Sequence, residues 1–378
     1  LPPSLIALDP GDAVTLALGG REARYRLTAI TDTGAREAAG IASEASLFGA
    51  AAAPERGTGS EPAPSWGTPL AVFLDLPLLT GEETPYAPRV AVAADPWPGG
   101  VAIYKDAGAG LALDRVVTRE AAIGRTLTPL MPGPTARWDE ANAFTVELAS
   151  GTMASAEAPA VLTGANRAAL ETPDGAWEVI QFRDALLTGE NTYLLSGLLR
   201  GQAGTEAAMR APLEAGARFV LLDDAVSELG LMEAERGLAR DWAYGPAPLP
   251  YDDESYAAVT RSFDGVGLRP LSPVHVRAVR GMDGAVDLNW IRRTRKGGDS
   301  WQGLDVPLAE EMEAYEVEIR DGATVKRVIA AILPAASYTA AGQIADFGST
   351  AFASLDVTIY QLSRSAGRGT GRSARLDL

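Results

Sequence analysis

Glycine and proline recur so often in this chain that long helices are hard to fit between them. The 378 residues include 40 Gly and 25 Pro, about one position in six. Glycine costs about 1 kcal/mol relative to alanine inside a helix, and proline removes a backbone donor. The sequence therefore predicts an all-β fold, and its length favours two or three domains over one.

The residue types present exclude several classes of chemistry. There is no Cys and a single His, so disulfide frameworks, thiolate metal sites and cysteine nucleophiles are excluded, and a Ser-His-Asp triad is disfavoured. The formal net charge of -16 disfavours nucleic acid as a partner, because phosphates would be repelled. With 47% hydrophobic residues the chain can bury a core. We predict no cofactor, no metal site and no catalytic residue.

Turn-rich segments divide the chain into four parts. Residues 1–48 contain two alternating segments joined by Gly19-Gly20, which predict a hairpin at the end of an upstream domain. Residues 49–64 have few large apolar side chains and read as a linker or long loop. Residues 65–270 predict a β-rich domain, and residues 271–378 predict a β-sandwich. Strand candidates in the third part are Leu70–Leu74, Arg89–Ala93, Gly100–Tyr104, Ala143–Leu148, Glu178–Phe182, Thr192–Leu195 and Ala217–Leu222.

Strict alternation is clearest in the last part. Val286, Leu288 and Trp290 alternate with polar residues, and Tyr315 and Val317 begin a second such run. Period-2 segments with one apolar face are what a two-sheet sandwich needs. The Pro-led first strand and the Trp on the second resemble a fibronectin type III module over residues 271–378.

The strongest candidate for a binding site is a basic cluster in this module. Arg292, Arg293, Arg295 and Lys296 are followed closely by Trp301. On so acidic a chain, such a loop could grip an anionic glycan or the acidic face of a partner. The alternative is that the loop is charged for solubility, as loops between sandwich strands commonly are.

Other signals favour structural roles. Gly197 to Thr205 is Gly-rich but lacks the Lys of a phosphate-binding loop, so it predicts a turn. His275 lies on the polar face of its strand and is given no role. The clusters of acidic residues are expected to be exposed to solvent. These clusters are Asp223-Asp224, Asp252-Asp253-Glu254 and Glu310-Glu311 with Glu313. The alternative function is a carbohydrate-active enzyme or glycan-binding module that uses paired carboxylates and exposed aromatics, candidates being Trp97, Trp138, Trp177 and Trp301.

The order of several segments resembles the C-terminal part of phage tail-tip hub proteins. The similarity runs over most of residues 1–230 and is most specific at Leu195 to Thr205. It is strongest towards the baseplate hub, or host-specificity protein, of alphaproteobacterial gene transfer agents. The segments are Leu8–Leu18, Ala23–Thr31, Ala122–Leu148, Thr163–Asn166, Trp177–Phe182 and Leu194–Glu206.

The resemblance implies a non-enzymatic, homotrimeric virion component that closes the tail tube and helps to engage or penetrate the recipient envelope. Its implied partners are other tail-tip and baseplate proteins, and a cell-surface glycan or outer-membrane receptor. It would be assembled in the bacterial cytoplasm and act extracellularly in the tail of a virion-like particle. Because the sequence begins at Leu1, without an initiator Met, either a leader has been removed or this is the C-terminal part of a longer chain, and we expect the second. The glycosidase-like barrel of longer family members is not visible here, so no hydrolase activity is carried over.

Overall fold

A computed structural model describes residues 1–43, 65–106, 108, 110–298 and 306–378, and it confirms the predicted all-β, multi-domain fold. The chain divides into two compact units, Leu1–Ser65 and Trp66–Leu378. The predicted linker at 49–64 lies outside the described residues. Within them, the α-helices are the short segments α1 (Ala158–Leu162) and α2 (Ala340–Phe347), and no helix is long and apolar enough to cross a membrane.

The first unit is a three-stranded antiparallel sheet in the order β1-β2-β3. Its strands are β1 (Ala13–Leu18), β2 (Arg21–Asp32) and β3 (Arg36–Ala42). Gly19 and Gly20 both have positive φ, the conformation that a two-residue hairpin turn requires. Among the described residues of this unit, Leu27 is the one apolar residue that is buried, while Leu16 and Ile41 are 45% and 61% exposed. The sheet therefore has little core of its own.

The second unit begins with a sandwich that is made of two sheets. One sheet has the order β15-β5-β4 and the other β17-β16-β6-β7. Trp242, Phe73 and Phe263 meet between the two sheets, with ring centroids 5.7 to 6.3 Å apart. The strands are β4 (Leu70–Leu74), β5 (Arg89–Ala93), β6 (Val101–Asp106), β7 (Leu111–Val117), β15 (Ser227–Glu228), β16 (Arg240–Pro246) and β17 (Ala257–Arg261).

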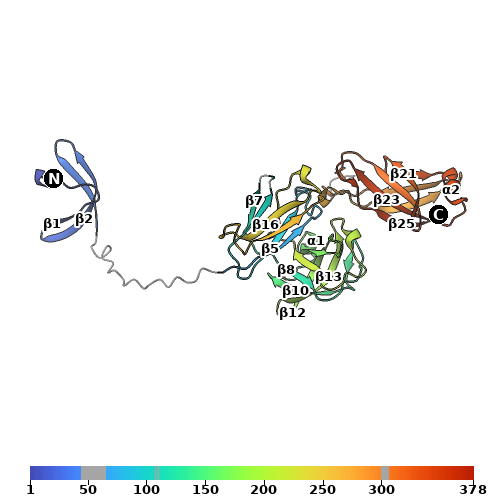
Figure 1. Ribbon diagram of the computed structural model, residues 1–378, viewed down its shortest axis with the longest axis horizontal. Coiled ribbons are helices and arrows are strands. Elements are labelled where there is room, and N and C mark those ends of the chain that lie inside the picture. Colours follow the sequence, from blue (N-terminus) through green and yellow to red (C-terminus); the bar gives the residue numbers. More distant parts are fainter. Residues whose placement is uncertain (44–64, 107, 109, 299–305) are drawn as a thin grey trace. The chain divides into compact units, whose positions relative to one another are not determined.

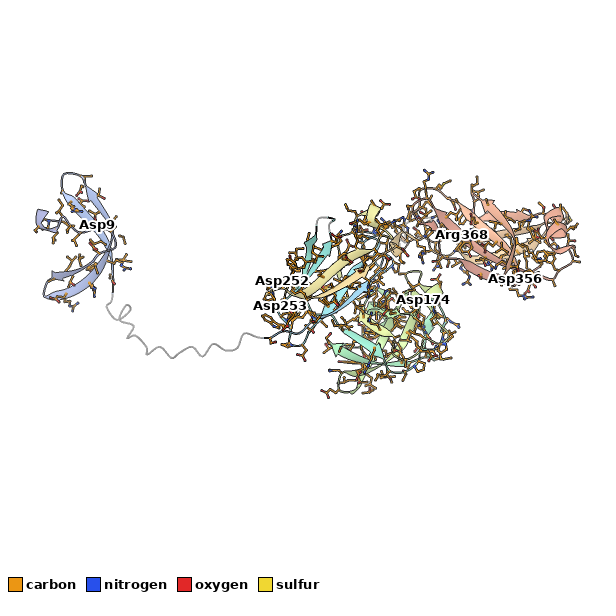
Figure 2. All side chains as sticks on the ribbon, in the orientation of Figure 1. Asp9, Asp174, Asp252, Asp253, Asp356 and Arg368 are labelled. Carbon is orange, nitrogen blue, oxygen red and sulfur yellow. The ribbon has the colours of Figure 1, made fainter. Side chains whose placement is uncertain are left out.

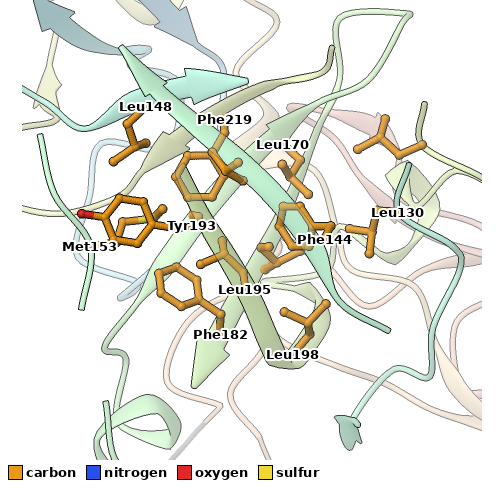
Figure 3. Packing of buried hydrophobic residues seen from close by; sticks show 14 residues of the cluster. Leu130, Phe144, Leu148, Met153, Leu170, Phe182, Tyr193, Leu195, Leu198 and Phe219 are labelled. Atoms are coloured by element: carbon orange, nitrogen blue, oxygen red, sulfur yellow. The ribbon is translucent and has the colours of Figure 1, made fainter. Parts of the chain in front are cut away.

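A barrel is inserted between β7 and β15 of this sandwich (Figure 1). Its sheet has the order β10-β8-β14-β11-β12-β13, and β10 also pairs with β13, which closes the ring. Phe144, Phe182 and Phe219 are fully buried in its core (Figure 3). The strands are β8 (Ile123–Thr126), β10 (Phe144–Ser150), β11 (Arg167–Glu171), β12 (Trp177–Gly189), β13 (Thr192–Gln202) and β14 (Arg218–Leu221), and the short β9 (Trp138–Asp139) pairs with β13.

The barrel and the sandwich share a second core. Val72 and Leu74 of β4 pack in one buried cluster with Val179 of β12 and Val220 of β14. Side chains on the two faces of β12 thus serve both cores, because residues alternate in direction along a strand. The run from Trp177 to Phe182 is buried throughout for this reason.

The chain ends in a second two-sheet sandwich, as predicted. One sheet has the order β18-β19-β22, and the other has β21-β20-β23, with β24 and β25 also pairing with β23. Trp290, Tyr315 and Ile359 belong to its buried core. The strands are β18 (Val274–Arg280), β19 (Val286–Ile291), β20 (Tyr315–Asp321), β21 (Thr324–Ala331), β22 (Ala335–Tyr338), β23 (Ser354–Ser363), β24 (Gly367–Arg368) and β25 (Arg372–Asp377).

Glu83 fixes the segment that follows β4. Its carboxylate accepts hydrogen bonds from the backbone N–H groups of Leu79 (3.1 Å), Thr80 (2.9 Å) and Gly81 (2.9 Å), and it lies 3.0 Å from Arg89 Nη2. Burial raises the pKa of Glu83, but the backbone donors and the Arg89 guanidinium together outweigh it and lower the pKa to about 2. The ionised carboxylate therefore stabilises this fold.

We expect the contribution of Glu83 to be lost as the pH falls from about 4.5 to about 2. A folded-state pKa below the unfolded value stabilises the protein above the unfolded pKa and stops doing so below the folded one. In urea unfolding, Glu83→Gln should lower the free energy of unfolding by about 1–3 kcal/mol at pH 6, and by much less near pH 2. Glu82→Gln, at an exposed neighbour, is the matched control. A pH-independent effect of Glu83→Gln would contradict this role.

Candidate functional site at the basic loop

The basic loop predicted as a contact site follows β19 in the terminal sandwich. The structure describes Arg292, Arg293, Arg295 and Lys296, while Trp301 lies outside the described residues. Each of the three arginines has partners within the chain. The loop is therefore a joint within the second unit, and whether it also contacts a partner stays a prediction.

Arg292 and Arg295 tie the loop to the segment that precedes β20. Arg292 donates to the carbonyl oxygens of Pro307 (2.9 Å) and Val306 (2.8 Å). Arg295 Nε donates to Glu310 Oε1 at 3.1 Å, and the side chains of this pair are only 8% and 3% exposed. Because both charges of the Arg295–Glu310 pair are shielded from water, removing one partner would be strongly destabilising.

Arg293 joins the terminal sandwich to the barrel. Its guanidinium donates to Glu206, which begins the 3-10 helix η3 (Glu206–Ala208) just after β13. It also donates to the Oγ of Ser272 at 2.6 Å and to the carbonyl oxygen of Ser272 at 2.7 Å. Ser272 Oγ in turn donates to Glu206 Oε1 at 2.5 Å. This cluster fixes the start of the sandwich against the barrel.

Lys296 differs from its three neighbours. The residue is exposed, and its backbone N–H donates to Thr294 Oγ1 at 3.2 Å. Glu206 and Glu310, the partners of Arg293 and Arg295, were not singled out as partners from the sequence. Glu206 lies 87 residues from Arg293 along the chain, and no local pattern signals a pairing at that separation.

The sequence also did not indicate the most deeply buried ion pair among the described residues. Arg200 of β13 is 0% exposed and donates from Nε and Nη2 to the two carboxylate oxygens of Glu178 on β12, at 2.7 and 2.8 Å. Its third nitrogen donates to the carbonyl oxygen of Met131 at 2.7 Å. The predicted turn at Gly197 to Thr205 is thus wrong in its first part, because residues up to Gln202 continue β13.

Several of the acidic residues noted in the sequence accept hydrogen bonds within the chain. Asp253, in the loop between β16 and β17 (Figure 2), accepts from Ser255 N and Oγ at 2.9 and 2.6 Å. Glu311 accepts from the backbone N–H groups of Arg364 and Ser365, at 3.0 and 3.1 Å. Backbone hydrogen bonds lower the pKa of Glu311 to about 2. In the described part of the chain, no group of three His, Asp or Glu side chains is placed to hold a metal ion.

One cavity brings carboxylates and an aromatic residue together. It measures about 420 Å³ and is lined by Asp75, Asp174 and Trp177, among others. Asp75 accepts from three successive backbone N–H groups, those of Asp264, Gly265 and Val266, at 2.8 to 3.1 Å, and burial raises its pKa despite them.

Asp174 in the same cavity is held equally firmly. Its two oxygens accept from Arg210 Nη2 at 2.6 and 2.7 Å, and Oδ1 also accepts from Thr172 at 2.6 Å. The Thr172 and Arg210 hydrogen bonds lower the pKa of Asp174. Both carboxylates therefore have fixed partners that suit loop stabilisation better than proton transfer.

The family model that matches the chain covers the barrel. A family model described as "Rcc01698-like, C-terminal" matches residues 121–220, a segment that begins just before β8 and ends within β14. The matched family thus corresponds to the inserted barrel. No curated protein matches the chain.

A search of solved structures found the crystal structure of the Spr0440 glycoside hydrolase domain, Endo-D, from Streptococcus pneumoniae R6. The identity is 11% and the TM-score 0.17, over 82% of this chain and 43% of that chain. The chain therefore spans less than half of that structure. A TM-score this low supports neither a shared fold nor a shared activity.

Proposed function

We propose that this chain is a structural component of a phage-like tail tip, the baseplate hub. In this role it closes the tail tube and helps to engage or penetrate the recipient cell envelope. It assembles as a homotrimer with other tail-tip proteins and acts outside the producing cell. The proposal is supported by the resemblance of segments over most of residues 1–230 to tail-tip hub proteins and by an all-β scaffold whose charged side chains largely serve to join its parts.

The main support for self-association is that the first unit has almost no hydrophobic core of its own. Leu16 and Tyr25 lie on one face of its sheet, since Val14 faces Tyr25 and Leu16 faces Ala23 in the register. On the other face, Thr15 lies opposite Arg24. A small sheet with an apolar face gains stability by covering that face. In the proposed trimer, equivalent sheets of neighbouring subunits cover it.

Light scattering of the purified chain tests this assembly. We expect a particle of three times the 39.4 kDa chain mass at micromolar concentration. Leu16→Asp places a charge on the apolar face and should raise the protein concentration needed for trimer formation at least tenfold. Thr15→Asp, on the opposite face, should leave that concentration unchanged. A chain that stays monomeric, both alone and within a longer parent polypeptide, would contradict the proposed hub role.

A further inference from the structure

A second cavity, of about 320 Å³, lies where the barrel and the terminal sandwich meet. Its walls come from the segment after β4, from β11, β12 and the end of β13, from the segment that precedes β18, and from the basic loop after β19. This volume is at the lower end of the range for small-molecule sites. Gly204 has positive φ, and a Cβ there would lie 2.3 Å from Leu271 Cδ2. A side chain at this position would strain the backbone and displace the Leu271 side chain, which packs against Gly204.

The charge of this cavity is of one sign. Arg167, Arg269, Arg293 and Arg295 all line it, and no Asp, Glu or Lys is among its described lining residues. Arg293 and Arg295 have their charges balanced by Glu206 and Glu310. Arg167 and Arg269 have no ion pair or hydrogen bond from their side chains to any residue that the structure describes. Two positive charges therefore face the cavity without a counter-charge.

Arg167 is placed by its surroundings. It begins β11, and its guanidinium lies against Gly164, where a Cβ would be 3.0 Å from Nη2. Arg269 approaches from the segment between the 3-10 helix η5 (Val266–Leu268) and β18, and it also borders the cavity that contains Asp75. Because these two residues come from the barrel and from the segment leading to the sandwich, the charge arises only when both parts are folded together.

On a chain of net charge -16, local positive charge in a recess is a specific feature. A cleft lined by one sign of charge concentrates the field and attracts ions of the opposite sign. Guanidinium groups match carboxylate, sulfate and phosphate oxygens, with which they form paired charge-assisted hydrogen bonds. An anionic ligand would supply the missing counter-charge to Arg167 and Arg269.

We propose that this cavity is a binding site for a small ligand that bears a carboxylate, sulfate or phosphate group. The anionic group is contacted by Arg167 and Arg269, while Arg293 and Arg295 form the wall on the side of the sandwich. This site is independent of the proposed tail-tip role, since it needs one chain only.

Isothermal titration calorimetry on the full chain tests the site with four probes in low-salt buffer. Sodium phosphate and sodium sulfate report a free oxyanion, whereas glucose 6-phosphate and glucuronate report an anionic group carried by a sugar. We expect at least one probe to bind saturably with one site per chain. The probe that binds tightest identifies the source of the anion. Absence of saturable binding by all four probes up to millimolar concentration would overturn the proposal.

Variants locate the binding. Arg167→Gln with Arg269→Gln should weaken binding at least tenfold. The control, Arg115→Gln with Arg137→Gln, removes the same charge at two exposed positions outside the cavity and should change binding less than twofold. If both double variants weaken ligand binding equally, the effect comes from the overall charge of the protein, and the proposed site is wrong. If the first pair does not fold, Arg269→Gln alone at its exposed position should still weaken binding at least threefold, and unchanged binding would count against the proposal.

Discussion

Replacing Arg200 by methionine is expected to lower the free energy of unfolding of the barrel by about 3–5 kcal/mol. Arg200 and Glu178 are both fully buried, and the guanidinium pairs with both carboxylate oxygens. The substitution would leave Glu178 buried with a negative charge and without its main partner. Removing one member of such a pair costs far more than the pair itself contributes.

The control distinguishes a stranded charge from lost packing. Arg200→Met with Glu178→Met removes both members of this pair and leaves Asp139, whose carboxylate lies 4.0 Å from Arg200 Nη1, so it should recover at least half of the loss. Arg125→Met breaks the exposed pair with Glu147 and should cost no more than about 1 kcal/mol. Denaturant unfolding with hydrogen exchange of the β12 and β13 peptides measures all three. A double variant as unstable as Arg200→Met would show that the stranded Glu178 carboxylate is not the cause.

Replacing Trp290 by alanine should destabilise the terminal sandwich by about 3–5 kcal/mol, the usual range for a buried aromatic residue. Trp290 is 4% exposed, and its ring meets that of Tyr315, which is fully buried, edge to face at 5.1 Å between centroids. The loss removes contacts between the two sheets, because Trp290 belongs to β19 and Tyr315 to β20.

Hydrogen exchange on the full chain measures this effect where it occurs. Peptides from β19, β20 and β23 should lose protection in Trp290→Ala, while those from the barrel core should keep theirs. Ile332→Ala is the matched control, since Ile332 is 74% exposed and its loss should change stability by no more than about 0.5 kcal/mol. Equal loss of protection in the barrel would mean that the sandwich and the barrel unfold as one.

The strands that the sequence predicted best are those whose pattern is local. Residues Val286 to Ile291 alternate between buried and exposed, as expected from period-2 apolar spacing. Leu70–Leu74 and Arg89–Ala93 were predicted with the bounds that the structure shows, because Pro and Gly lie near their ends. In these segments the residues alone specify the strand.

Other strands were missed where the tertiary structure outweighs the local signal. β7 (Leu111–Val117) is largely exposed at a sheet edge, and β11 (Arg167–Glu171) is short and buried on both faces, so neither shows a clean alternation. The glycines from Gly197 onward indicated a turn, yet Gly197 and Gly201 lie within β13, where their positive φ is tolerated inside the strand.

For the candidate site, too, the sequence indicated the local cluster but not its distant partners. The sequence identified the cluster that contains Arg293 and Arg295 but not its carboxylate partners, which come from distant segments. Arg167 and Arg269 were not singled out at all. Each is an isolated arginine in the sequence, and only the folded chain brings the two to one cavity.

The insertion of the barrel between β7 and β15 also dictates an order of events during synthesis. On the ribosome, the residues of the barrel emerge before β15, β16 and β17, so the barrel can close while the host sandwich still lacks those strands. The sandwich is completed only afterwards, and the pairing of Arg89 with Glu228 forms once the residues of the insertion have emerged. A nascent chain released too early would carry a finished barrel on an open, half-built sheet.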